Sequence, residues 1–133
     1  MKIPFTDLQS EYQECKWEID EAIKYCLENN SFITGPDVAE FEQIFSDYTG
    51  GESCAACGSG TTALQISLKA CGIGRGDEVI TVSHTFVSTP EAVCTVGATP
   101  VFCDVNKHGL IDINRAESLI TNKTLTNGRL LVQ

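Results

Sequence analysis

A glycine-rich turn flanked by hydroxyl residues is the part of the sequence that points most directly to chemistry. Gly58 and Gly60 enclose Ser59, and Thr61 and Thr62 follow at the expected start of a helix. Glycine lets a backbone approach a ligand closely, and the first N–H groups of a helix lack partners inside it. Because a helix start also carries partial positive charge, the turn suits a phosphate group. The simpler alternative is a plain strand-to-helix connection in which Ser59 or Thr61 caps the helix.

Cysteine is the second residue type that could do chemistry, with seven copies in the chain. Cys54 and Cys57 match the C-x-x-C spacing of redox and zinc sites. Residues three apart in an extended strand point to opposite faces, however, which makes this pair a poor chelate or disulfide. Only His84 and His108 are present to complete a zinc site. We expect reduced thiols and no bound metal, with a thiol or zinc protein as the alternative.

Length and charge narrow the classes of function. The 133 residues are enough for one ordinary domain. The 18 acidic and 9 basic residues give a formal net charge of −9. That balance argues against nucleic acid or an anionic membrane as the main partner. The first residues lack the apolar run of a signal peptide, and no stretch approaches transmembrane length, so a cytoplasmic protein is expected.

Strands and helices are expected to alternate in the second half of the chain. Short apolar stretches predict strands at 53–57, 78–82 and 100–105, with a helix after the first and another at 90–96. This order is typical of an α/β fold with a parallel sheet and right-handed crossovers. The turn signal Asn127-Gly128 stands where a further strand would continue the pattern.

The carboxyl ends of these strands should gather the candidate site residues. Ligands of parallel sheets bind at that edge. The turn at 59–62, the residues 84–86 after the second strand, and Asp104 after the third would all meet there. On its sequence context alone, Phe86 is interpreted as a core aromatic.

Helices are expected to dominate the first half. One is predicted over 10–29 from a capping-box pattern and apolar spacing, and a second from Pro36 to the stop at Gly50-Gly51. The link at 31–35 carries large apolar residues that either pack in the core or cover a neighbouring site. Later in the chain, Asp112 is expected to cap a last helix.

Five short motifs carry a resemblance to a known family. They are Phe32-Ile33-Thr34-Gly35-Pro36, Ser59-Gly60-Thr61-Thr62-Ala63-Leu64, Gly72-Ile73-Gly74-Arg75-Gly76-Asp77-Glu78-Val79-Ile80, Thr85-Phe86-Val87-Ser88-Thr89 and Val96-Gly97-Ala98-Thr99-Pro100-Val101-Phe102. In this order they resemble the amino-terminal part of the DegT/DnrJ/StrS family, over residues 3 to 124. These are sugar aminotransferases that depend on pyridoxal 5'-phosphate (PLP).

The resemblance implies a fold and a division of the chain. The family has the aspartate-aminotransferase fold, PLP fold type I, whose large domain is α/β with a parallel-type sheet and flanking helices. Residues 1–35 would then be an amino-terminal helical segment. Residues 36–133 would be an incomplete PLP-binding large domain.

The resemblance also implies a cofactor, a substrate class and binding residues. Gly60, Thr61 and Thr62 match the turn that holds the phosphate of PLP, and Phe86 matches the aromatic residue that stacks on the pyridine ring. The family transfers an amino group, usually from glutamate, to nucleotide-linked keto sugars used in polysaccharide biosynthesis. Its full-length members are expected to form homodimers.

The family's remaining machinery has no match in this sequence. The lysine that carries the cofactor and the acidic partner of the ring nitrogen lie beyond the matched region, and Lys69 and Lys123 do not fit the lysine motif. Asp104 is better interpreted as a structural carboxylate at a strand end. No catalytic residue is assigned, and the isolated chain is predicted to be an inactive fragment. The alternative is a non-catalytic phosphate-binding, PLP-binding or assembly module derived from the family.

Overall fold

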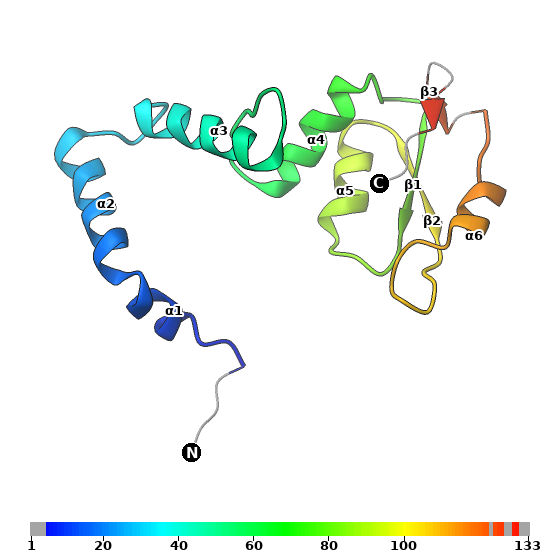
Figure 1. Cartoon of the computed structure of the whole chain (residues 1–133). Coiled ribbons are helices and arrows are strands. Elements are labelled where there is room, and N and C mark those ends of the chain that lie inside the picture. The colour runs from blue at the N-terminus through cyan, green and yellow to red at the C-terminus, as the bar shows by residue number, and fades with distance from the viewer. Residues whose placement is uncertain (1–4, 123, 127–128, 131–133) are drawn as a thin grey trace. The chain divides into compact units, whose positions relative to one another are not determined.

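The chain divides into two compact units, which are described separately. The computed structural model describes residues 5–122, 124–126 and 129–130. One unit is Met1–Ala56 and the other is Cys57–Gln133 (Figure 1). The division at residue 35 expected from the sequence stays a prediction.

The first unit begins with two helices where the sequence predicted one over 10–29. α1 spans Leu8–Glu14 and α2 spans Lys16–Asn29. They meet at Cys15, whose φ of −111° and ψ of 13° depart from helical values. The single-helix prediction was therefore wrong at this residue, because apolar spacing does not report a one-residue break.

Polar side chains define the start of α1 and bridge the break. Asp7, three residues before the predicted start of the helix, is the N-cap, and its carboxylate accepts a hydrogen bond from the Ser10 N–H at 3.2 Å. Across the break, the Tyr12 hydroxyl donates to Asp20 at 2.7 Å and accepts from the Lys16 ammonium at 2.9 Å. Lys16 also forms a salt bridge with Asp20. The hydrogen bond to Asp20 is the larger cause, and the hydrogen bond to Tyr12 the smaller one, of a raised pKa for Lys16. The cluster links α1 to α2.

The third helix follows its sequence signals closely. α3 spans Pro36–Thr49, with proline in its first turn. It ends at Gly50, whose φ of 69° lies in the left-handed region that glycine adopts without strain. Both predicted limits are confirmed. Among the described residues of the first unit, Ser46 alone is buried, so this unit has no buried apolar core.

The second unit is a small α/β layer built on a parallel pair of strands. β1 and β2 pair in parallel from Glu78 opposite Thr99 to Val82 opposite Cys103. The elements in chain order are α4 (Gly60–Ala70), β1 (Glu78–Val82), α5 (Ser88–Thr95), β2 (Thr99–Cys103), α6 (Ile113–Ser118), β3 (Leu125–Thr126) and β4 (Arg129–Leu130).

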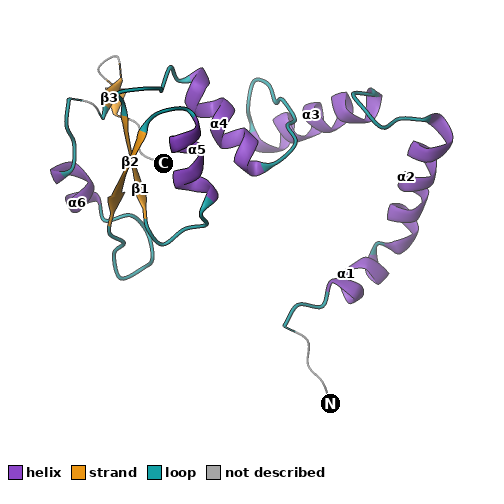
Figure 2. Cartoon of the chain, turned by 180° about the vertical axis from the view of Figure 1, so that it is seen from behind, coloured by secondary structure: helices purple, strands orange, loops and turns teal. Residues whose placement is uncertain are grey.

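Two apolar clusters fix helices to both faces of this sheet. On one face, Val79 of β1 packs with residues of α4 and α5, among them Leu68 and Val93. On the other face, Ile80 of β1 packs with Ala116 of α6. Figure 2 shows α5 and α6 on opposite sides of β1 and β2. The near-complete burial of β1 agrees with its continuous apolar sequence, since a strand covered on both faces needs no polar alternation.

The predicted strand at 53–57 was wrong, whereas the other strands are close to their predicted places. Residues 53–57 belong to no helix or strand. A strand exists only through a partner, and no other described strand pairs with this segment. β2 ends at Cys103, and Val105 makes only an isolated bridge to Ile111. β3 and β4 pair antiparallel, while the turn predicted at Asn127-Gly128 lies outside the described residues.

The last helix begins where its cap predicted. The Asp112 carboxylate accepts hydrogen bonds from the N–H groups of Asn114 at 3.1 Å and Arg115 at 3.3 Å. This satisfies two of the free donors at the start of α6. Across the ranges that the structure describes, no helix combines the length and apolar character needed to cross a membrane.

Candidate functional site

An open cavity of about 490 Å³ lies in the second unit, beside the N-terminal ends of α4 and α5. α4 precedes β1 and α5 follows it, and both helices run antiparallel to the parallel strands. Both helices therefore start at the edge of the sheet where β1 ends. The residues that line the cavity are Gly60, Thr61 and Leu64 from α4, Phe86 from the loop after β1, and Ser88 and Thr89 from α5.

The start of α4 leaves two backbone donors unused. The Ser59 hydroxyl caps the helix by accepting from the Thr62 N–H at 3.2 Å, and the Ser59 carbonyl accepts from the Ala63 N–H at 2.9 Å. Within the described part of the chain, the N–H groups of Gly60 and Thr61 have no acceptor. An ordinary cap therefore coexists with two free amides at the positive end of the helix dipole.

The glycines of this turn provide space rather than unusual backbone angles. Neither Gly58 nor Gly60 has a positive φ. A Cβ built on either residue would meet nothing within 4 Å. The backbone here is open to an incoming group, as the phosphate interpretation requires.

Phe86 lines the cavity and does not pack in a core. Its side chain is 75% exposed, so the interpretation as a core aromatic was wrong. The loop that carries it is tied to α5 by the Thr89 N–H, which donates to the Phe86 carbonyl at 3.1 Å. An exposed ring face held in this way can stack on a flat ligand.

Two other residues expected at this edge lie outside the cavity wall. Thr62 shares a hydroxyl contact of 3.0 Å with Ser59 and does not line the cavity. Asp104 accepts from the Val105 N–H at 2.9 Å and lies 3.3 Å from the guanidinium of Arg115. These are the contacts of a carboxylate that stabilises a strand end.

The sequence did not single out Ser88 and Thr89, which belong to the cavity. Ser88 is the first residue of α5 and is only 8% exposed. The sequence placed the start of this helix at Pro90, because proline is typical of a first turn. A helix start two residues earlier would have put two further hydroxyls beside Phe86.

The wall of the cavity fits a phosphate and a flat ring and provides no amine. The free N–H groups of Gly60 and Thr61 suit an anion, and Phe86 suits an aromatic system. No lysine or arginine stands among the described lining residues. Lys69 lies in the last turn of α4, at the end opposite to the free amides.

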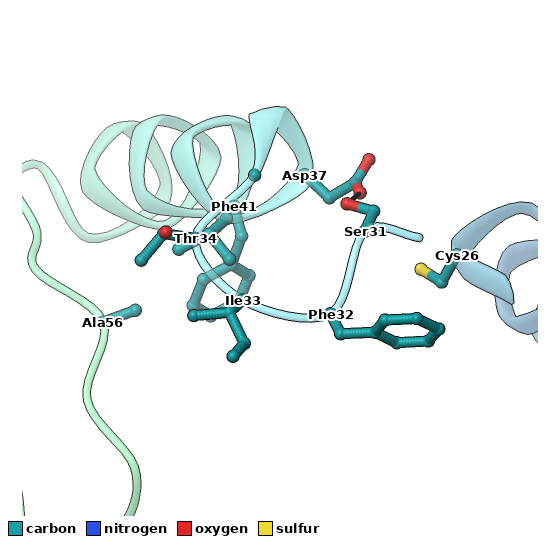
Figure 3. Close-up of a pocket in the computed structure, with 10 residues that line it drawn as sticks. Cys26, Ser31, Phe32, Ile33, Thr34, Asp37, Phe41 and Ala56 are labelled. Carbon is teal, nitrogen blue, oxygen red and sulfur yellow. Dashed lines mark hydrogen bonds between the residues drawn. The ribbon is translucent and has the colours of Figure 1, made fainter. Parts of the chain in front are cut away.

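A second hollow, of about 280 Å³, lies in the first unit around the link between α2 and α3 (Figure 3). The link was expected either to pack in a core or to cover a site. Phe32 is 63% exposed and Ile33 is 85% exposed, so neither packs in a core of the described structure. Both line the hollow, together with Cys26 of α2 and Phe41 of α3.

A local hydrogen bond fixes the shape of this link. The Ser31 hydroxyl donates to the Asp37 carboxylate at 2.7 Å. A Cβ on Gly35 would stand 2.7 Å from the Ser31 oxygen, which explains glycine at that position. Thr34 has a φ of 39°, an unusual conformation for a β-branched residue. The link is therefore a tightly defined turn, although its large side chains remain open.

The cysteine pair shows no sign of a redox or metal site. Cys54 and Cys57 are both free thiols. Within the described ranges, no three histidine, cysteine or acidic side chains are placed to hold a metal ion. The Cys57 thiol instead contacts the Ser59 carbonyl at 3.4 Å, within the turn that precedes α4.

Comparison with known proteins identifies the family. The model of the DegT/DnrJ/EryC1/StrS aminotransferase family matches residues 13–132. The chain is 40% identical over 123 residues to the UDP-2-acetamido-2-deoxy-3-oxo-D-glucuronate aminotransferase of Pseudomonas aeruginosa, covering 92% of this chain and 34% of that protein. It is 42% identical to the erythromycin biosynthesis sensory transduction protein EryC1 of Saccharopolyspora erythraea, covering 93% of this chain and 34% of that protein.

A solved structure agrees with the sequence relatives. The crystal structure of DesV from S. venezuelae matches with a TM-score of 0.88 and 37% identity, covering 92% of this chain and 33% of that chain. The chain thus spans about a third of the length of the relatives that it matches, and its α/β layer is part of the fold of PLP-dependent aminotransferases. On this evidence, the chain belongs to the DegT/DnrJ/EryC1/StrS aminotransferase family.

Proposed function

We propose that this chain is the cofactor-phosphate-binding part of a PLP-dependent aminotransferase. The complete enzyme would transfer an amino group, with glutamate as donor, to a nucleotide-linked keto sugar in polysaccharide biosynthesis. The observation that carries the proposal is the cavity in which the free amides of Gly60 and Thr61 and the exposed ring of Phe86 form one wall.

Different residues of the cavity would bind different parts of PLP. The N–H groups of Gly60 and Thr61 would hold the phosphate, while Thr62, through its hydrogen bonds to Ser59, keeps the first turn of α4 in shape. Phe86 would lie against the pyridine ring. When bound, PLP supplies the electron sink that makes amino transfer possible.

The isolated chain is proposed to bind without catalysing. Amino transfer in this class needs a lysine at the cofactor. The described wall of the cavity contains none, and the six lysines of the chain include none in a motif that resembles the family's. Amino transfer from glutamate to a keto-sugar nucleotide, catalysed by the purified 133-residue chain, would refute this part of the proposal.

The proposed substrate, partner and compartment are those that the family resemblance implies. The Pseudomonas relative is named as an aminotransferase of a UDP-linked oxo sugar, which supports a nucleotide sugar as substrate. The complete enzyme would act as a homodimer. We place the enzyme in the cytoplasm, a reducing compartment in which the seven cysteines would remain thiols.

A non-catalytic binding or assembly module is the second candidate. Two observations favour it: the described cavity wall offers no amine, and the EryC1 relative is named as a sensory transduction protein. Such a module would hold a phosphorylated ligand reversibly, without a covalent bond to lysine.

Two titrations test binding and the absence of an amine at the site. Pyridoxamine 5'-phosphate cannot condense with lysine, so a saturable, stoichiometric change in its phosphorus NMR signal would report the site alone. Unphosphorylated pyridoxamine is the control and should bind much more weakly. PLP is then added with borohydride, and reversible binding without reduction at a lysine is the expected result for the aminotransferase part and for the module alike. An absorbance band fixed to one lysine would show an amine at the cofactor and refute the proposal that this chain binds without one, and no binding of either phosphorylated compound would refute both candidates.

A further inference from the structure

Two helix N-termini, rather than one, border the cavity of the second unit. α4 contributes its first residues, Gly60 and Thr61, and α5 contributes Ser88 and Thr89. Both helices pack against the same face of β1, in the apolar cluster that includes Val79. The positive ends of both dipoles therefore adjoin one open space.

The start of α5 has spare donors, and both belong to Ser88. The N-cap residue, Val87, offers no side-chain acceptor, and the third residue, Pro90, has no N–H. The Thr89 N–H already donates to the Phe86 carbonyl. In the described part of the chain, neither the N–H nor the hydroxyl of Ser88 has a hydrogen-bond partner.

The Ser88 side chain is buried from solvent yet open to the cavity. The residue is 8% exposed and forms part of the cavity wall. Among described side chains, the Thr81 hydroxyl is the one polar group that is both sealed off and unpaired. The Ser88 hydroxyl is also unpaired but is not sealed off, and Ser88 is part of the cavity wall. An unpaired hydroxyl at this place can donate a hydrogen bond to a ligand in the cavity.

The charge of the surroundings indicates which group completes it. No lysine or arginine lines the cavity in the described structure, and the chain carries a formal net charge of −9. An anion can be held here only by uncharged donors and helix dipoles. The free N–H groups at the start of α4 are uncharged donors of this kind, and the N–H and hydroxyl of Ser88 add further ones.

We propose that Ser88, at the start of α5, is a binding residue that donates a hydrogen bond to the ligand's phosphate, so that the anion is held between the N-termini of α4 and α5. This inference rests on the proposed function, because it assumes that the cavity takes a phosphorylated ring. It adds a donor that the glycine turn does not contain.

The test compares four forms of the 133-residue chain in titrations with pyridoxamine 5'-phosphate, inorganic phosphate and pyridoxamine. Ser88→Ala removes the hydroxyl, Ser88→Thr retains it, and Thr95→Ala removes an exposed hydroxyl at the far end of the same helix. A hydrogen bond to a charged group is worth enough that Ser88→Ala should weaken both phosphorylated ligands about tenfold. Ser88→Thr and Thr95→Ala should bind as the unaltered chain does, and pyridoxamine should be unaffected by any change.

The outcomes distinguish this inference from the function on which it rests. If the unaltered chain binds pyridoxamine 5'-phosphate and Ser88→Ala binds it equally well, the inference is overturned while the proposed function stands. If Ser88→Ala weakens pyridoxamine as much as its phosphate, Ser88 contacts the ring, and the inference is also overturned. If the unaltered chain binds no phosphorylated ligand, the proposed function fails. Circular dichroism of each variant must match the unaltered chain, so that lost binding is not lost folding.

Discussion

Exposure separates the proposed binding residue Phe86 from the buried residue Thr81. Phe86 is 75% exposed at the cavity, whereas Thr81, on the neighbouring strand, is fully buried with an unpaired hydroxyl. A substitution of Phe86 should therefore change the affinity for a ligand, and a substitution of Thr81 should change the free energy of unfolding. Each case can be tested with a single variant.

Replacing Phe86 by alanine should weaken ring binding without unfolding the chain. Because the side chain is exposed, the free energy of unfolding should change by less than about 0.5 kcal/mol. Loss of stacking, worth about 1 kcal/mol, should lower the affinity for pyridoxamine 5'-phosphate about fivefold. Inorganic phosphate has no ring and should bind unchanged. Phe102→Ala, at an exposed phenylalanine outside the cavity, is the control. An equal loss for phosphate and its pyridoxamine ester would contradict the assigned role of the ring.

Replacing Thr81 by valine should stabilise the second unit. Valine keeps the branched shape and removes a hydroxyl that is buried without a partner. We expect the free energy of unfolding to rise by about 1 kcal/mol, measured by urea denaturation. Thr81→Ser keeps the hydroxyl and removes a methyl group, so it should be destabilising. A lower free energy of unfolding in Thr81→Val would show that the hydroxyl makes a stabilising hydrogen bond.

For single residues, the sequence predicts hydrogen-bond donors near a helix start better than it predicts which side chains are exposed. The Ser59 cap and the free amides at the start of α4 followed from residue types alone, since glycine, serine and a helix start each act locally. The exposure of Phe86 did not, because it depends on which distant elements cover the ring. Ser88 was missed for a related reason: Pro90 supplied a stronger helix-start signal than the residue where α5 begins.

Helices with a specific capping residue were predicted most accurately. α3 begins at Pro36 and stops before Gly50, and α6 begins after Asp112, as their sequences indicate. Each signal works through contacts within a few residues. The strand expected at 53–57 failed because pairing is non-local, and no described strand lies beside it. Composition can favour a strand but cannot supply its partner.

Substitutions at Ser59 should separate helix capping from anion binding. Ser59→Ala removes the acceptor of the Thr62 N–H and should cost about 1 kcal/mol of unfolding free energy. Ser59→Asp keeps a capping oxygen and should retain stability. Its carboxylate, however, would occupy the positive end of α4 and repel a phosphate, lowering affinity about tenfold. Thermal denaturation and phosphate titration of both variants provide the measurement. Undiminished phosphate binding by Ser59→Asp would place the anion elsewhere.

Across the whole molecule, apolar surface is unevenly covered. In the described structure, all buried apolar side chains belong to the second unit. The first unit instead exposes a series of large apolar side chains along α2 and α3, namely Trp17, Ile19, Ile23, Tyr25, Leu27, Val38, Phe41, Ile44, Phe45 and Tyr48. Isolated soluble chains rarely leave so much apolar surface in contact with water. This exposed surface of the first unit is therefore available for association with another apolar surface.

The isolated chain should therefore self-associate, with the apolar surface of the first unit as its contact. Light scattering after size exclusion should give a mass that rises with protein concentration. The mass should also rise with salt, because screening relieves the repulsion between chains that each carry a formal net charge of −9. The double substitution Trp17→Gln with Phe41→Gln removes two exposed apolar side chains and should shift the mass toward that of one chain. Gln43→Asn, at an exposed polar position of α3, changes no charge and should leave association unchanged. A constant single-chain mass at every concentration and salt level would show that the exposed apolar side chains do not drive association.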